Sequence, residues 1–478
     1  MREHDRLFIG GGWTAPAGTG TIEVLSPHTE EVVGRVPDGT PADIDTAVAA
    51  ARRAFDHGPW PRMTPAERAE ALGRLSDIYT LHQQEMAELV TEEMGSPISF
   101  SVFGQALLPQ QVLQYYVDLA SAFTWEEERP GVLGPVTVTR EPVGVVAAIY
   151  PWNVPQFTLM MKLAPALIAG CTVVAKPSPE APLDAYLLAE WIEQAGLPDG
   201  VVNIVPGGRE TGAHLVEHPG VDKVAFTGST AAGRAIGAAC GRLLRPVTLE
   251  LGGKSAAIIL EDADLSSTME GFKLACLMNN GEACAAQTRI LAPRSRYDEV
   301  ADALAEMVSG LTVGDPADER TEIGPLVAAR QRDRVEGYIR IGLDEGATLL
   351  AGGLDRPRDR GWYVAPTVFG EVGNDMRIAR EEIFGPVLAL LPYDDEEDAV
   401  RIANDSDYGL GGSVWTADVD HGVEVARRIR TGSCGVNLYV LDPNTPFGGY
   451  KDSGLGRELG PEGLAPYLEY KTIPRPRL

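Results

Sequence analysis

The sequence predicts an α/β protein whose first large unit is a parallel sheet covered by helices on both faces. Between residues 145 and 251, short apolar segments alternate regularly with longer segments of helical pattern. The short segments are nearly continuous runs of Val, Ala, Ile and Leu, which is typical of strands buried on both faces of a parallel sheet. Ligands of such sheets bind at the carboxyl ends of the strands, so the chemistry is expected there.

The individual elements of this unit follow from the same pattern. The expected strands are Val145–Tyr150, Thr172–Lys176, Val201–Val205, Lys223–Thr227 and Val247–Leu251. The helices expected between them are Gln156–Ala169, Pro182–Ala195, Thr211–His218 and Ala231–Leu243.

Peripheral strands and several helices are expected before this sheet. Residues 7–36 are short apolar segments broken by Gly and Pro, which indicates one or two hairpins. Apolar residues then recur at helical spacing over 44–55. The next helix should begin at Thr64-Pro65-Ala66-Glu67, which has the form of a capping box with proline in the first turn. Helical pattern continues to about residue 121, with an interruption near Gly95-Ser96-Pro97.

A ribbon and a second domain complete the expected organisation. Residues 130–143 alternate between apolar and polar side chains and predict a two-stranded ribbon. An isolated hairpin is marginally stable in water, so we expect it to pair with another element, such as a neighbouring subunit. Residues from about 253 to 440 repeat the α/β alternation. Helices are expected there over 264–280, 297–311, 326–345 and 396–404, and strands near 289–292, 387–392 and 412–416.

Composition restricts the partners and the compartment. The formal net charge of −27 argues against nucleic acids and anionic membranes, because both attract basic proteins. No apolar run approaches the ~20 residues of a membrane span. The charged N-terminus lacks the apolar core of a signal peptide. The five cysteines are scattered and form no C-x-x-C pair, so a reduced cytoplasm is the expected location.

One loop of the first sheet has the character of a phosphate site. The segment Phe226–Gly233 runs from a strand into a helix start, where Gly228 allows a tight turn and free N–H groups attract anions. It matches neither the G-x-G-x-x-G nor the Walker pattern, so an ordinary strand-to-helix turn is an open alternative.

A zinc-protease pattern is also present. The segment from His214 to His218 fits H-x-x-E-H, but Pro219 and Gly220 end the helix directly afterwards. No further ligand suggests itself, so we expect surface histidines and no metal.

A cysteine in the second half is the candidate nucleophile. Cys284 lies in the polar, small-residue segment 279–289, where a substrate carbonyl has room to approach the sulfur. A thiolate is a strong nucleophile, but near neutral pH it needs a lowered pKa or a nearby base. From this segment alone, a small buried residue is the preferred interpretation.

Other polar groups stand where the predicted strands end or in loops of the second half. Each has an ordinary interpretation as a loop polar group, a surface acid or a core residue. The segments are Tyr150-Pro151-Trp152-Asn153, Lys176-Pro177-Ser178, Leu249-Glu250-Leu251-Gly252-Gly253-Lys254, 381–387 (EEIFGPV) and 446–451 (PFGGYK). Taken together with Cys284, and in this order, they resemble the aldehyde dehydrogenase superfamily from about residue 8 to the C-terminus.

The resemblance implies NAD(P)-dependent oxidation of an aldehyde to a carboxylic acid. It also implies three parts: a five-stranded Rossmann-like cofactor domain (1–121 and 144–252), an α/β catalytic domain (253–445), and a small oligomerisation ribbon with a C-terminal segment (122–143 and 446–478). The ribbon at 130–143 and the C-terminal Tyr467–Ile473 would pair across subunits in a homodimer or homotetramer.

The same resemblance assigns catalytic roles. Cys284 would attack the aldehyde, the Asn153 amide and the Cys284 N–H would stabilise the oxyanion, and Glu250 would activate water to hydrolyse the thioester. Lys176 is counted with the catalytic groups as well as with the cofactor site. The expected cofactor-binding residues are Ile149, Tyr150, Trp152, Lys176, Ser178, Gly228, Ser229, Gly233, Leu251, Gly252, Glu382 and Phe384. Cys171, Cys240, Cys276 and Cys434 are interpreted as structural.

Two positions depart from the family pattern. Glu282 stands where the family usually has Gln, and an ionised carboxylate near Cys284 would raise the thiol pKa. Many NAD-preferring members have Glu three residues after the ribose-binding lysine, but here Pro179 occupies that position and Glu180 follows it. NAD is the expected cofactor, and NADP is not excluded.

Two alternative functions were weighed. CoA-acylating members of the superfamily generally lack the glutamate base, so Glu250 argues against that activity. A non-catalytic descendant would have lost Cys284, Asn153 or Glu250, and all three are present. The substrate channel is expected to be mostly apolar, which favours an uncharged aldehyde. Its expected lining is Tyr150, Gln156, Phe157, Met160, Met161 and the segment Leu438-Tyr439-Val440.

Overall fold

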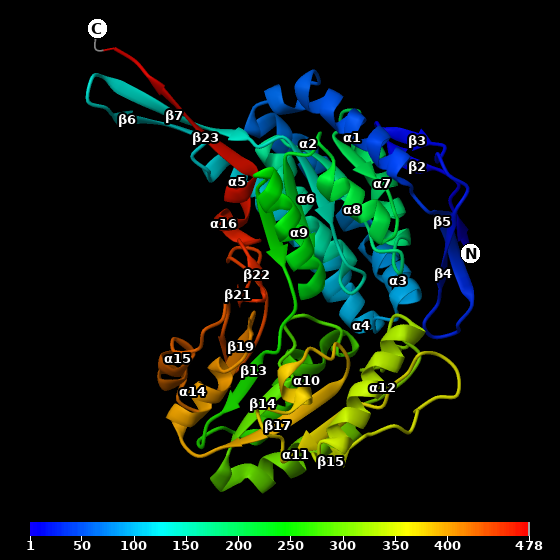
Figure 1. Cartoon of the computed structure of the whole chain (residues 1–478), viewed down its shortest axis with the longest axis vertical. Coiled ribbons are helices and arrows are strands. Elements are labelled where there is room, and N and C mark those ends of the chain that lie inside the picture. Colours follow the sequence, from blue (N-terminus) through cyan, green and yellow to red (C-terminus); the bar gives the residue numbers. More distant parts are fainter. Residues whose placement is uncertain (477–478) are drawn as a thin grey trace.

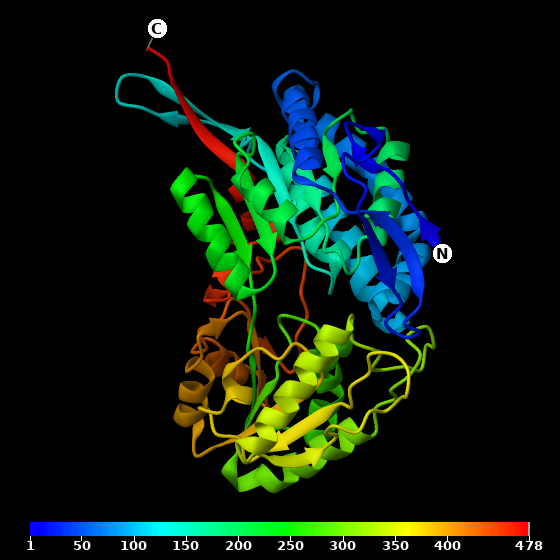
Figure 2. The same cartoon turned by 45° about the vertical axis from the view of Figure 1, so that its right-hand side comes forward.

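The computed structural model describes residues 1–476 and contains two α/β units and a projecting ribbon (Figure 1). The first unit is built on an eight-stranded sheet and the second on a seven-stranded sheet. The ribbon leaves the first unit and points away from the second (Figure 2). No helix within residues 1–476 is long and apolar enough to cross a bilayer.

The centre of the first sheet is the expected five-stranded parallel array. In the order β12–β11–β8–β9–β10, its strands are β8 (Val145–Ile149), β9 (Thr172–Lys176), β10 (Val202–Ile204), β11 (Lys223–Thr227) and β12 (Val247–Glu250). All four pairings are parallel, and every residue of β8, β9 and β11 is buried, as expected for continuous apolar strands. The predicted α/β fold is confirmed.

Antiparallel strands extend both edges of this array. β2 (Leu7–Ile9) and β3 (Gly12–Thr14) lie beyond β10, and β22 (Gly454–Leu455) pairs with β12. Beside β22, the Ser453 hydroxyl donates to the carbonyl oxygen of Gly252 at 2.7 Å. The sequence grouped residues 446–478 with the ribbon, whereas this part of them completes the first sheet.

Helices cover both faces of the first sheet. One face carries α1 (Pro41–Asp56), α8 (Arg209–Glu217) and α9 (Thr230–Leu243). The other carries α6 (Pro155–Ala169) and α7 (Leu183–Ala195), with α2 (Pro65–Leu81), α3 (Gln83–Met94) and α5 (Leu108–Ala122) packed outside them. α2 begins as predicted, because Thr64 caps it and the reciprocal bonds of a capping box join Thr64 and Glu67.

The chain between α3 and α5 has a form that the sequence pattern did not reveal. α3 ends at Gly95, which has a positive φ, and the chain then forms α4 (Ile98–Phe100). It continues through a π-helical segment, η2 (Ser101–Leu107), directly into α5. Wide π turns often occur at functional sites, and this one borders the main cavity.

The second sheet has the order β15–β16–β17–β14–β13–β19–β20, with only β15 antiparallel. Its strands are β13 (Ala256–Ile259), β14 (Arg289–Pro293), β15 (Thr348–Ala351), β16 (Thr367–Gly370), β17 (Val387–Tyr393), β19 (Gly412–Trp415) and β20 (Gly435–Val436). Its helices are α10 (Leu265–Leu277), α11 (Tyr297–Ser309), α12 (Ala329–Asp344), α13 (Arg377–Arg380), α14 (Glu396–Asn404) and α15 (Val419–Ala426). The predicted second α/β alternation is present.

Small elements complete the fold. A three-stranded sheet contains β1 (Arg2–Glu3), β5 (Val32–Pro37) and β4 (Thr21–Leu25), and β18 (Tyr408–Gly409) pairs with β21 (Tyr450–Lys451). α16 (Gly460–Leu464) packs against α6 and leads toward the last strand.

The ribbon consists of β6 (Glu126–Pro130), β7 (Pro135–Pro142) and β23 (Leu468–Pro474). β23 runs antiparallel to β7 over its whole length, from Leu468 opposite Pro142 to Pro474 opposite Val136. The two segments therefore form one sheet within the chain, and their pairing with a neighbouring subunit stays a prediction. They pair within one chain because Tyr467 accepts a main-chain hydrogen bond from Val143 at 3.0 Å and starts β23 beside β7.

Candidate active site

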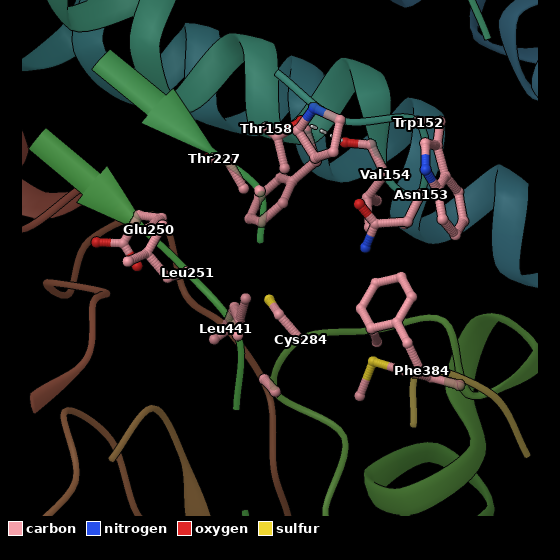
Figure 3. A pocket seen from close by; sticks show the side chains of 18 of the residues that line it. Trp152, Asn153, Val154, Thr158, Thr227, Glu250, Leu251, Cys284, Phe384 and Leu441 are labelled. Carbon is pink, nitrogen blue, oxygen red and sulfur yellow. Dashed lines mark hydrogen bonds between the residues drawn. The ribbon is translucent and has the colours of Figure 1, made fainter. Parts of the chain in front are cut away.

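A cavity of about 370 Å³ lies between the two α/β units. Asn153, Glu250 and Cys284 come from distant segments and all line it (Figure 3). Seven of the expected cofactor residues line it too: Trp152, Gly228, Ser229, Leu251, Gly252, Glu382 and Phe384. One wall is the carboxyl edge of the first sheet, which is where doubly wound sheets bind their ligands.

Cys284 is carried by an irregular segment between α10 and β14, here called the nucleophile turn (residues 278–286). Met278 leaves the helix with ψ 143°, and Asn279, Asn280 and Gly281 follow with φ values of 53°, 62° and 73°, a left-handed run that prevents the helix from continuing. Gly253 lies so close that a Cβ there would be 2.4 Å from the carbonyl oxygen of Cys284. Only glycine fits, so the linker between the sheets holds the nucleophile in place.

The Cys284 thiol is protonated at neutral pH in this environment. Burial raises the pKa of Cys284 to about 12, and the carboxylates of Glu382 and Glu250 contribute to the increase. The N–H groups of Cys284 and Ala285 lower it. The sulfur therefore needs a base or a neighbouring positive charge to become an effective nucleophile.

The Asn153 side chain is buried and held by the nucleophile turn. Its Nδ2 donates to the carbonyl oxygen of Glu282 at 2.9 Å. The main-chain oxygen of Asn153 accepts from Nδ2 of Asn279 at 2.9 Å and from Nε2 of Gln105 at 2.8 Å. These contacts leave the second N–H of the amide for the cavity, where an oxyanion hole needs a donor.

Glu250 is buried at the end of β12 with neither carboxyl oxygen hydrogen-bonded to a residue within 1–476. Burial raises the pKa of Glu250 well above its usual range, and the carboxylate of Glu458 raises it further, while Lys162 opposes the shift. The carboxyl group points away from the Cys284 sulfur in Figure 3. A carboxyl group with a raised pKa and open oxygens is suited to proton transfer near neutral pH.

A buried ion pair near Glu250 acts on its pKa. Lys162 Nζ lies 2.8 Å from Glu458 Oε1 and donates to Thr227 Oγ1 at 2.5 Å. The sequence reading did not identify this pair. A lysine inside the otherwise apolar helix α6 was the available signal, because a charge in such a helix requires a buried partner.

The cofactor side of the cavity is built from both units. Trp152 and Phe384 meet edge to face with ring centroids 5.5 Å apart. Oε1 of Glu382 accepts from the N–H of Gly253 at 3.0 Å, and burial raises the pKa of Glu382 to about 6. Ser229 caps α9 by accepting a hydrogen bond from the N–H of Ala232, and the first turn contains no acidic residue, so the positive end of the helix dipole favours a phosphate there. A carboxylate for ribose hydroxyls and a helix start for pyrophosphate fit a dinucleotide.

The other predicted cofactor residues lie outside the cavity lining. Ile149 and Tyr150 are buried at the end of β8, Ser178 follows the end of β9, and Gly233 lies in the first turn of α9. Lys176 Nζ donates to the carbonyl oxygens of Pro177 at 2.8 Å and Gly207 at 2.5 Å. These contacts fix the Lys176 ammonium at the end of β9. The catalytic role given to Lys176 and the cofactor roles of all five residues stay predictions.

Helix α12 contributes residues that the sequence reading missed. Arg330, Gln331 and Arg334 line the cavity. Gln331 Nε2 donates to the carbonyl oxygen of Phe384 at 2.6 Å, and Arg334 donates to that of Glu382 at 2.5 Å. α12 thus fixes the loop that carries the predicted ribose contact. Helical periodicity placed α12 correctly, but it does not show which face meets a distant loop.

The arm of the cavity beyond Cys284 is apolar. It is lined by Phe100, Phe103, Gly104, Leu108, Val154, Phe157, Met161, Leu274, Met278, Tyr439, Val440, Leu441 and Phe447. Phe157, Met161, Tyr439 and Val440 were expected there. Tyr150, Gln156, Met160 and Leu438 were also expected and do not line it. Gln156 faces the core instead, where its Nε2 donates to Asp184 at 2.6 Å.

The Glu282 carboxyl contacts a loop of the second unit. The charged groups with the largest effect in raising the Cys284 pKa are Glu382 and Glu250. The Glu282 carboxyl faces the loop before α12, where its Oε1 accepts from the N–H of Val327 at 3.2 Å. Burial raises the pKa of Glu282 well above its usual range, which favours its neutral form, so the effect of an ionised carboxylate at this position on the thiol stays a prediction.

The H-x-x-E-H histidines meet a carboxylate that the sequence did not indicate. Asp45 of α1 lies 2.6 Å from Nε2 of His214 and 3.3 Å from Nε2 of His218. The N–H of Gly220 donates to Nδ1 of His218 at 3.0 Å. In neutral His218 the proton is therefore on Nε2, which donates to Asp45 and has no lone pair for a metal.

Comparison with known proteins identifies the family. The model of the aldehyde dehydrogenase family matches residues 13–473. The geranial dehydrogenase of Castellaniella defragrans is 52% identical over 472 residues, which cover 98% of each chain. Among solved structures, an aldehyde dehydrogenase of Mycobacterium tuberculosis complexed with NAD⁺ is 50% identical, with a TM-score of 0.98 and 99% of each chain covered. A mutant aldehyde dehydrogenase C of Pseudomonas syringae in complex with NAD⁺ and octanal is 42% identical, with a TM-score of 0.95 and 98% and 96% covered.

This chain belongs to the aldehyde dehydrogenase family. It is an oxidoreductase that converts an aldehyde into the carboxylic acid with a nicotinamide cofactor.

Proposed function

We propose that this enzyme is a hydrolytic, NAD-dependent aldehyde dehydrogenase in which Cys284 is the nucleophile, Asn153 the oxyanion donor and Glu250 the base for thioester hydrolysis. The observation that carries the proposal is that these three side chains line one cavity. The same cavity has the carboxylate of Glu382 and the start of α9 on its other side.

In the first step the Cys284 sulfur attacks the aldehyde carbon, and the thiol proton passes to water in the cavity and on to solvent, so Glu250 stays ionised for the later hydrolysis. The carbonyl oxygen becomes an oxyanion. The free N–H of the Asn153 amide and the main-chain N–H of Cys284 stabilise it, and one such donor is worth about 3–4 kcal/mol.

A dinucleotide would be held by Trp152, Ser229, Glu382 and Phe384, with Ser229 and the start of α9 on the pyrophosphate. When bound, the oxidised nicotinamide would supply the hydride acceptor. Loss of the hydride would leave the substrate attached to Cys284 as a thioester. Glu180, which accepts a hydrogen bond from Ser178, disfavours a 2′-phosphate and so favours NAD. The solved relatives from M. tuberculosis and P. syringae in complex with NAD⁺ support this choice.

Hydrolysis of the thioester is the task of Glu250. Its carboxylate takes a proton from water, the resulting hydroxyl adds to the thioester carbon, and the acid and the Cys284 sulfur are released. Only ionised Glu250 can act, and its pKa is raised, so hydrolysis should accelerate as pH rises through that pKa. Lys162 supports the ionised form, because its positive charge lowers the Glu250 pKa.

The substrate is proposed to be an uncharged, predominantly apolar aldehyde. The arm beyond Cys284 is lined by apolar and aromatic side chains, and the two cavity arginines, Arg330 and Arg334, contact the cofactor side instead. Its mouth exposes apolar side chains, with Phe103 40% and Val440 52% exposed. The relatives named for geranial and bound to octanal support the same class.

An aldehyde panel tests the proposal. Octanal, benzaldehyde and succinic semialdehyde are each assayed with NAD and NADP, with and without CoA, by the absorbance of the reduced cofactor. We expect the highest kcat/KM for octanal with NAD and no dependence on CoA. Preference for the charged semialdehyde would contradict the substrate class, and a requirement for CoA would contradict the hydrolytic mechanism.

A larger residue at position 104 should restrict the enzyme to shorter aldehydes. The Phe100 ring lies over Gly104, where an added Cβ would be 2.6 Å from Cζ of Phe100. Gly104→Val should push this ring into the apolar arm and lower kcat/KM for octanal roughly tenfold or more, with little change for acetaldehyde. Gly73→Ala is the matched control, since a Cβ at Gly73 meets nothing within 4 Å. Equal losses for both aldehydes would contradict the assignment.

The ribbon is proposed to join copies of this chain into a homodimer or homotetramer in the cytoplasm. Support comes from the outer edge of β23, whose residues after Leu468 are exposed, and from the ribbon tip, where Val132 is 95% and Leu133 84% exposed. The five free cysteines fit a reducing compartment. Light scattering should give two or four times the chain mass of 51.1 kDa, and a monomer would contradict this.

A further inference from the structure

Glu282 lies two residues before the nucleophile and is completely buried. Its Oε1 accepts from the N–H of Val327, and its Oε2 has no hydrogen-bond partner within residues 1–476. Arg330 on α12 is the charged side chain that acts on it, but this arginine is largely exposed and its guanidinium pairs with Glu180. The Glu282 carboxyl thus has no ion-pair partner among the described residues.

A carboxylate buried without a counter-ion is strongly destabilised relative to the neutral acid. Burial raises the pKa of Glu282 well above its usual range, and the Val327 N–H and Arg330 only partly oppose this. As a neutral acid, Glu282 keeps one oxygen as the acceptor for Val327 and carries its proton on the carboxyl group. In this state it has the charge and shape of the Gln that stands there in the family pattern.

The main chain of Glu282 supports the second catalytic group. Its carbonyl oxygen accepts from Nδ2 of Asn153 at 2.9 Å and from Nδ2 of Asn279 at 3.4 Å. Its N–H donates to the carbonyl oxygen of Asn279 at 2.9 Å. Any movement of Glu282 therefore displaces both the turn that carries Cys284 and the amide that faces the oxyanion.

The neighbouring Asn280 ties the same turn to the same loop. Its Oδ1 accepts from the N–H of Gly324 at 2.6 Å, and its Nδ2 donates to the carbonyl oxygens of Pro325 at 2.9 Å and Gly95 at 3.0 Å. Asn280 holds one end of the turn, and Glu282 holds the end next to Cys284. The loop 324–327 leads directly into α12, which fixes Glu382 and Phe384 on the cofactor side.

We propose that Glu282 is a positioning residue that ties the nucleophile turn to Val327 and thereby aims both the Cys284 sulfur and the Asn153 amide at the substrate. The proposal rests on the proposed function of this site. It adds that the tie holds only while Glu282 is protonated, because an ionised side chain must draw in water or turn out of its buried position. The acylation step should then slow at alkaline pH.

The test compares Glu282→Gln and Glu282→Ala with the wild-type enzyme in a rapid-mixing assay of the first burst of reduced cofactor. Glutamine keeps the acceptor for Val327 and cannot ionise. The Gln variant should match the wild-type burst rate near pH 7 and exceed it at the alkaline end. The Ala variant should acylate roughly ten- to a hundredfold more slowly at every pH, since small misplacements of reacting groups have effects of this size. Binding of the cofactor should be unchanged in both.

Each outcome has a defined meaning. Identical alkaline profiles for the wild type and Glu282→Gln would overturn the role of protonation, and an undiminished burst in Glu282→Ala would overturn the tie. If the Ala variant does not fold, the comparison of the pH profiles of Glu282→Gln and the wild type still tests the proposal. Exposed Glu306→Gln on α11 is the matched control and should leave the profile unchanged. A wild-type burst in the same assay establishes the proposed function independently of Glu282.

Discussion

Replacement of Cys284 by alanine should abolish formation of the reduced cofactor. No other cysteine lines the cavity among the described residues, so no second sulfur can attack the aldehyde. Loss of one sulfur atom removes little packing, so the fold should persist. We expect a loss of at least about 10⁴-fold, the scale on which removal of a catalytic nucleophile acts, measured as kcat with octanal and NAD.

Two controls make this result specific. Cys434→Ala removes a free thiol from outside the cavity lining and should retain turnover. Binding of NAD to the Cys284→Ala variant, followed by quenching of tryptophan fluorescence, should match the wild type because Trp152 and Glu382 are untouched. Undiminished turnover in the variant would disprove the mechanism.

Glu250→Gln should separate the two halves of the reaction. Glutamine has the size of the native side chain but cannot accept a proton from water, so acylation should still occur once per site while hydrolysis slows. General-base groups contribute roughly 10²–10⁴-fold. We therefore expect a first burst close to one equivalent and a steady-state rate about 10²-fold lower or more.

The pH dependence gives a second measurement on the same variant. In the wild-type enzyme the steady-state rate should rise with pH through the elevated pKa of Glu250, and this limb should disappear in the Gln variant. Glu261→Gln, a change at an exposed residue, should keep both the burst and the limb. A lost burst with normal thioester hydrolysis would contradict the role given to Glu250.

The sequence predicted the sheet and its order of elements well because burial on both faces leaves a strong local pattern. β8, β9 and β11 were placed to within one residue for this reason. α10 was extended to residue 280, whereas it ends at Leu277. Its apolar spacing continues, but the backbone of Met278 leaves the helix with ψ 143°, and Asn279 and Asn280 follow with positive φ. A helix stop set by contacts with Gly95 and Pro325 is not visible in local periodicity.

The sequence motifs indicate the site residues, but they do not show which other side chains surround them. Phe103, the phenylalanine of the π-helical segment 101–107, could not be assigned to the apolar arm, because normal helical spacing points it elsewhere. Gln156 and Tyr150 were placed in the arm for a similar reason, since both follow a strand end that does face the cavity. The sequence shows only how close Glu282 is to Cys284 along the chain, whereas the direction and protonation of its carboxyl decide its effect on the thiol.

The late position of residues 453–458 has a consequence for how the enzyme matures. β22 completes the sheet edge beside Glu250, and Glu458 supplies the carboxylate that pairs with Lys162. A ribosome releases these residues only after it has made every other strand of the two large sheets. Until then, Glu250 lacks the neighbouring strand β22, and Lys162 lacks its ion-pair partner Glu458. The catalytic base reaches its working environment last, so a nascent chain should carry a folded cofactor sheet well before it can turn over an aldehyde.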